Sequence, residues 1–154
     1  MRLTLLFVLF PGMTLFAQVP SAFETHLSAG EAALQQSRYT LADMELRAAL
    51  AEAARPGQSA SVPVTRLAEA NSVLCDLDLM MSRFDEAIVL AKAALGLLDW
   101  LKAGQTPPDL SPALVRLAGA YRAAGKTNLA PPLLERAIAI DQKPAADDPK
   151  VSAD

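Results

Sequence analysis

A chain of 154 residues is long enough for one domain with its own hydrophobic core. Hydrophobic residues make up 52% of the chain and charged residues 20%, which excludes a chain disordered throughout, and the low aromatic content of 5% favours helices over strands. Seventeen acidic residues against fourteen basic ones give a net charge of −3, which excludes the basic surface of a nucleic-acid-binding protein.

Residues 1–17 have the pattern of a secretory signal peptide. Arg2 supplies a positive start, and the apolar run that begins at Leu3 is interrupted by Pro11-Gly12 and ends at Ala17. The run is shorter than the roughly 20 apolar residues that a membrane span needs, and its flanks are those of a signal peptide. We expect cleavage near Ala17 and a periplasmic or secreted protein without a membrane span. The alternative is that the segment is retained as a membrane anchor.

Helix signals are dense after the signal peptide. Ser21 and Glu24 form a capping-box pattern, in which a hydroxyl and a carboxylate three residues apart accept from free N–H groups at a helix start. Gly104 and Gly125 follow the expected ends of two helices, where glycine is favoured. The polar, proline-containing residues 143–154 predict a disordered tail. We expect helices over about 22–37, 40–54, 61–81, 85–102 and 111–125, and a sixth that Thr127 or Asn128 caps and that ends near 142.

These six helices form three pairs, in which small residues recur at matching places. The matching residues of the second helices lie 45 and then 43 residues apart. Two antiparallel helices approach closely only where small side chains face each other, so the recurrence predicts three similar hairpins. The small residues are Gly30, Cys75 and Ala118 in the first helices, and Ala42, Ala87 and Ala130 in the second helices.

The pattern resembles the tetratricopeptide repeat (TPR), a helix–turn–helix of about 34 residues. The third pair carries it most fully, with Leu114-x2-Leu117-Ala118-x2-Tyr121, then Gly125, then Ala130-x3-Leu134-x2-Ala137. The resemblance covers residues 23–142 and implies an all-α, TPR-like solenoid of three hairpins over about 23–56, 62–104 and 111–142. The chain departs from the repeat in its period, which is about ten residues longer, as in longer-period variants. His26, Asn71 and Leu114 replace the repeat's tryptophan, and Asp78 replaces its tyrosine in the second pair.

The resemblance also implies a function, because TPR arrays bind partners on a concave face lined by the first helix of each pair. It implies an exported scaffold that binds another protein or peptide. Helical phase places on this face Glu24, Leu27, Glu31, Leu34, Gln35, Glu69, Ser72, Asp76, Leu79, Met80, Val115, Gly119, Arg122 and Ala123. The candidate partner-binding residues among them are Glu24, Glu31, Leu34, Glu69, Asp76, Leu79, Met80 and Arg122. Because carboxylates predominate, we expect a basic or apolar partner and not a free carboxylate terminus.

The sequence contains no residue set that is typical of an active site or a metal site. Cys75 is the only cysteine and His26 the only histidine, so we expect neither a disulfide nor a metal site, and we assign both residues to packing. Asp76 and Asp78 are two apart on a helix and point to different faces, which argues against a catalytic pair. With no Ser/His/Asp set and no glycine-rich phosphate loop, we expect no enzyme and no cofactor. Trp100 is expected to pack against the third pair, with anchoring of a partner as the alternative.

A second function stays open. A solenoid normally ends in a polar capping helix, and none is evident after Gln142. The apolar side chains of the last helix, including Leu133 and Ile140, then lack a cover. The alternative is therefore a structural or assembly subunit that self-associates through its last repeat into a homo-oligomer.

Overall fold

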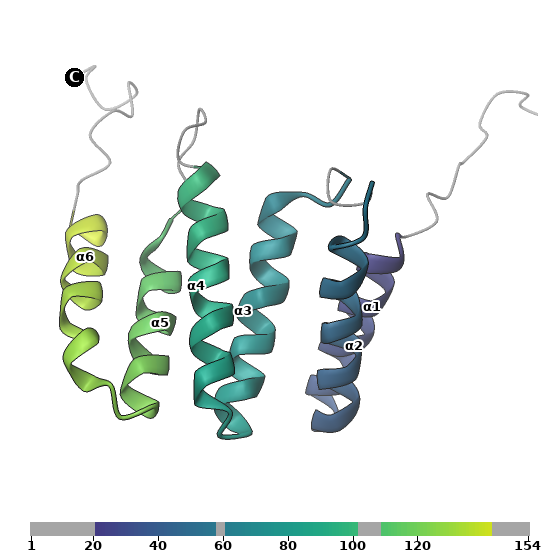
Figure 1. The fold of residues 1–154 in the computed structure, drawn as a ribbon, viewed down its shortest axis with the longest axis horizontal. Coiled ribbons are helices and arrows are strands. Elements are labelled where there is room, and N and C mark those ends of the chain that lie inside the picture. Colours follow the sequence, from purple (N-terminus) through teal and green to yellow (C-terminus); the bar gives the residue numbers. More distant parts are fainter. Residues whose placement is uncertain (1–20, 58–60, 102–108, 143–154) are drawn as a thin grey trace, which may run out of the picture.

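The computed structural model describes residues 21–57, 61–101 and 109–142, and these ranges contain helices and turns but no strand. Figure 1 shows the α-helices following one another along the molecule, from α6 at one end to α1 at the other, where α1 lies partly behind α2. The predicted all-α class is confirmed. The expected signal peptide at 1–17 and the expected tail at 143–154 lie outside the described ranges. The elements are α1 (Ala22–Gln35), α2 (Tyr39–Ala53), α3 (Val64–Met80), α4 (Phe84–Leu101), α5 (Ser111–Ala123), the 3₁₀ helix η1 (Thr127–Leu129) and α6 (Pro131–Asp141).

Most helix ends fall within two residues of the expected positions, with three corrections. Helix α3 begins at Val64 and not at 61, because Pro63 adopts an extended conformation before it. Thr127 does not cap the sixth helix but starts η1, which fills the gap before α6. The capping box is half formed. Ser21 Oγ accepts from the Glu24 N–H at 3.2 Å, while the Glu24 carboxylate binds Arg66 instead of turning back.

The three hairpins turn in the same way. Ser37, Ser82 and Gly125 each adopt a left-handed conformation, with φ of 57°, 60° and 74°. In each turn the next N–H donates to the carbonyl five residues back, which closes the helix in a Schellman motif. These bonds run from Arg38 to Ala33 at 2.9 Å, from Arg83 to Asp78 at 2.8 Å and from Lys126 to Tyr121 at 2.8 Å. The spacing of 45 and then 43 residues inferred from the small residues recurs in these turns.

Exchanging serine and glycine at equivalent positions of these turns should change stability in opposite directions. Left-handed backbone is unfavourable for serine but not for glycine, and a Cβ added at Gly125 would meet nothing within 4 Å. We therefore expect Ser82→Gly to stabilise the fold and Gly125→Ser to destabilise it, each by about 1 kcal/mol. Urea unfolding followed by circular dichroism measures both changes. Two shifts of the same sign would contradict the assignment of these turns.

The core runs through the array between successive helices. One cluster joins α1, α2 and α3, a second joins α3, α4 and α5, and a third joins α4, α5 and α6. The six recurrent small residues are all buried, as expected. The contact is closest at Gly30, where an added Cβ would lie 2.7 Å from Leu46 Cγ. Two expectations were wrong: Leu27 lies in the core and not on the expected concave face, and Trp100 is 70% exposed and not packed against the third hairpin.

A buried charge lies where the first two hairpins meet. Asp78 is fully buried and accepts hydrogen bonds from Arg83 Nε at 2.7 Å and from Arg47 at 3.2 Å. Both arginines also pair with Asp43. Burial opposes the charge of Arg83, but its bonds to Asp78 and Asp43 outweigh burial and raise its pKa. The departure from the TPR pattern at Asp78 is therefore matched by two arginines that neutralise it.

Candidate functional site

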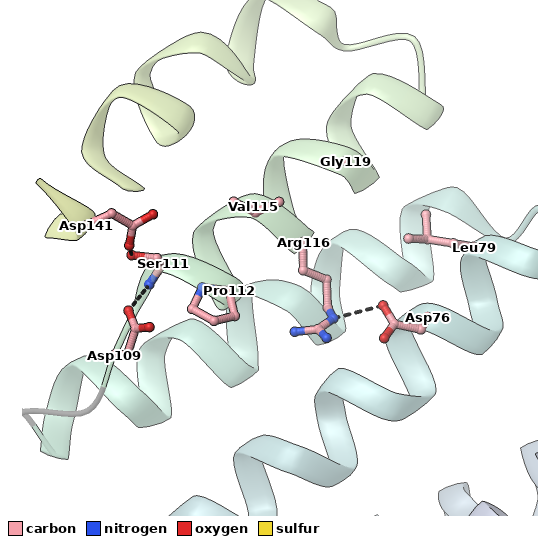
Figure 2. Close-up of a pocket in the computed structure, with 9 residues that line it drawn as sticks. All are labelled: Asp76, Leu79, Asp109, Ser111, Pro112, Val115, Arg116, Gly119 and Asp141. Carbon is pink, nitrogen blue, oxygen red and sulfur yellow. Dashed lines mark hydrogen bonds and ion pairs between the residues drawn. The ribbon is translucent and has the colours of Figure 1, made fainter. Parts of the chain in front are cut away.

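A hollow of about 540 Å³ opens between α3 and α5 (Figure 2). We call it the α3–α5 hollow. Ligand pockets in proteins typically enclose roughly 300–1,000 Å³, so its size suits a small ligand or a few side chains of a partner. Its lining consists of Asp76, Leu79, Asp109, Ser111, Pro112, Val115, Arg116, Gly119 and Asp141.

Ser111 organises one end of the hollow. Its backbone N–H donates to Asp109 Oδ1 at 2.8 Å, so Asp109 satisfies a free N–H group at the start of α5. Its hydroxyl donates to the Asp141 carboxylate and lies 3.3 Å from the Ala137 carbonyl. The start of α5 is thereby joined to the end of α6, and both carboxylates flank the same residue, as Figure 2 shows.

The middle of the hollow combines an ion pair with apolar walls. Arg116 Nε on α5 donates to Asp76 Oδ1 on α3 at 2.8 Å. Leu79 and Val115 line the hollow from α3 and α5, and Val115 is 51% exposed. Gly119 contributes no side chain, and a Cβ there would meet nothing within 4 Å, so this part of the hollow stays open. The walls therefore offer apolar contact beside a neutralised charge pair.

A second hollow of about 260 Å³ adjoins the first. The two share Asp109, Pro112 and Arg116, and the second continues along α3 past Glu69 and Ser72. Together they form a depression along the line where α3 faces α5. This shape suits an extended segment better than a compact small molecule.

The predicted residues divide between this depression and its surroundings. Asp76 and Leu79 line the α3–α5 hollow, and Glu69 lines the adjoining one. Met80 and Arg122 are exposed on α3 and α5 outside both hollows. On α1, Leu34 packs against the first core cluster and Glu31 is half-buried. The structure therefore brings three of the eight candidates together and leaves five apart, including Glu24.

Arginines offset much of the acidity expected on this face. Arg66 on α3 binds Glu24 on α1 through two hydrogen bonds, of 3.1 and 2.6 Å, and also pairs with Glu69. The hydrogen bonds from Arg66 hold the pKa of Glu24 below its usual value, although partial burial works in the opposite direction. With Asp76 paired to Arg116, three of the four predicted carboxylates have an arginine partner, and the two arginines offset two of the four negative charges. Counting carboxylates alone overstates the negative charge of the face.

Cys75 lies in the core, as expected, whereas His26 lies at the surface beside Glu45. Cys75 is fully buried, and burial, together with the charge of Asp76, raises the pKa of its thiol to about 12, so it stays protonated at neutral pH. His26 is partly exposed and its Nδ1 lies 2.7 Å from Glu45 Oε2. Across the described ranges no group of three or more histidine, cysteine, aspartate or glutamate residues is arranged to hold a metal ion.

Several residues in and around the two hollows were not predicted from the sequence. The ion pair of Arg66 could have been predicted, because Arg66 stands three residues before Glu69 on a helix, a spacing that favours ion pairs. The role of Asp109 could also have been predicted, since it stands just before a helix start. Nothing in the sequence indicated the contacts of Arg116 and Asp141, because their partners lie 40 and 30 residues away.

No protein-family model matches the chain, and a search of curated proteins gives no match either.

Proposed function

We propose that the protein is an exported tetratricopeptide-repeat scaffold that binds another protein or a peptide on the face formed by α1, α3 and α5. The observation that carries the proposal is the α3–α5 hollow, which continues along α3 as an open depression. The recurrent left-handed turns and the small residues at matching places support the repeat. The signal-peptide pattern of residues 1–17 supports export to the periplasm or the exterior.

The proposed role is binding without catalysis. The hollow pairs Asp76 with Arg116 and joins Asp109 and Asp141 to Ser111, so each of its charged side chains is held in place by at least one contact within the protein. No helix in the described ranges is long and apolar enough to cross a membrane. A face built from ion pairs and apolar walls suits recognition of another chain.

Photo-crosslinking in the native host tests this function. Benzoylphenylalanine placed at Val115, which lines the hollow, is expected to give a discrete adduct with the partner. The same residue placed at Ala93, an exposed position on α4 outside both hollows, serves as the matched control. Adducts at Ala93 but not at Val115, or at neither position, would count against binding through this face.

A second candidate is self-association through the last hairpin. Leu133 and Ile140, which were expected to lack a cover, are partly buried and pack against the core clusters. Ile138 on α6 is instead 52% exposed and Leu129 on η1 is 41% exposed, so other apolar side chains of this hairpin reach solvent. Light scattering would then give the mass of an oligomer for the native chain and that of a monomer for Ile138→Glu. A monomeric native chain would reject this alternative.

A further inference from the structure

We propose that the α3–α5 hollow binds an extended peptide segment that carries a lysine or arginine next to an apolar residue. The basic group binds between Asp109 and Asp141, and the apolar side chain packs on Leu79 and Val115. The inference rests on the proposed function of the face and specifies the chemistry of the partner.

The charge of the hollow favours a cation at one end only. Asp76 is offset by Arg116, whereas Asp109 and Asp141 have no ion pair with any residue in the described ranges. Both carboxylates accept a hydrogen bond from Ser111, which is 6% exposed, so the same buried residue holds them in place. Each carboxylate has a second oxygen that no described donor occupies. Two held carboxylates beside one hollow are complementary to an ammonium or guanidinium group.

The two carboxylates lie at opposite kinds of helix end, and this makes Asp141 the stronger site for a cation. Asp109 stands at the start of α5, where the helix dipole stabilises a negative charge. Asp141 is the last residue of α6, where the partial negative charge of the helix end repels a carboxylate. A cation supplied by a partner would relieve that repulsion. The hollow is thus most attractive to positive charge at its Asp141 end.

The rest of the hollow defines what accompanies the basic group. Leu79 is half-buried and Val115 half-exposed, so both offer apolar surface to a bound side chain. The adjoining hollow extends the depression along α3, which gives an extended backbone a continuous path. A free polyamine would satisfy the carboxylates but would leave the apolar wall exposed, and a peptide satisfies both.

Fluorescence anisotropy with three labelled octapeptides tests the inference on the full mature chain. One probe alternates lysine and leucine, the second glutamate and leucine, and the third lysine and serine. We expect the lysine–leucine probe to bind at least about ten-fold more tightly than either of the others, because only it offers both chemistries. The double variant Asp109→Asn/Asp141→Asn should weaken its binding by a similar factor, and asparagine retains the hydrogen-bond acceptor at each position.

Matched variants separate this inference from the broader function. Glu86→Gln/Glu135→Gln removes two exposed carboxylates outside the hollows and should leave binding unchanged. If the lysine–leucine probe binds Asp109→Asn/Asp141→Asn as tightly as the native chain, or if the glutamate–leucine probe binds equally well, the inference is overturned. The photo-crosslinking test at Val115 distinguishes the two proposals. An absence of adducts there would overturn the proposed function, whereas adducts would still form if the face bound a partner of another chemistry.

Discussion

Replacing Asp78 by alanine is expected to destabilise the protein by about 3 kcal/mol, because breaking a buried ion pair leaves its partners uncompensated. Asp78 is fully buried and is the shared acceptor of Arg47 and Arg83. The loss stays at the lower end of the range for buried pairs, since Arg47 is 45% exposed and both arginines keep Asp43. Urea unfolding measures the change as a lower midpoint.

The neighbouring carboxylate provides the control. Asp76 lies on the same helix, is 53% exposed and pairs with Arg116. Because exposed ion pairs contribute little, Asp76→Ala should change stability by less than about 1 kcal/mol. Asp78→Asn should fall between the two, since the amide retains one acceptor but no charge. Equal effects of Asp76→Ala and Asp78→Ala would mean that the ion pairs of Asp78 with Arg47 and Arg83 do not hold the first two hairpins together.

The order of helices followed from the sequence because its signals are local. Helical propensity, the small-residue recurrence and glycine at position 125 depend on neighbours a few residues away. The left-handed turns at Ser37 and Ser82 were not anticipated, since serine gives no turn signal as strong as that of glycine. The exposure of Trp100 also escaped, because packing across hairpins depends on how far successive hairpins rotate, and no local pattern sets that rotation.

The candidate site was only partly predictable for the same reason. Helical phase assigned Asp76, Leu79, Val115 and Gly119 to one face, and all four line the α3–α5 hollow, because residues on one helix face follow from spacing alone. It placed Leu27 on the wrong side, where the first hairpin packs on α3. The chemistry of the hollow depends on pairs such as Asp141 with Ser111, whose members come from different helices. Such pairs become visible only when the helices are packed together. Without them, the sequence overstated the negative charge of the face.

Replacing Ala87 by leucine is expected to destabilise the protein by about 3 kcal/mol, because a larger side chain overpacks a contact that already excludes solvent. Ala87 is fully buried in the second core cluster beside Cys75 and Leu117, at the place that Ala42 holds in the first hairpin. The matched control is Ala93→Leu, an exposed position on the same helix, which should change stability by less than about 0.5 kcal/mol. Both are read from urea midpoints. If the two leucines had equal effects, the close packing of α3 on α4 would not depend on Ala87, and the small-residue alignment behind the repeat would lose its physical basis.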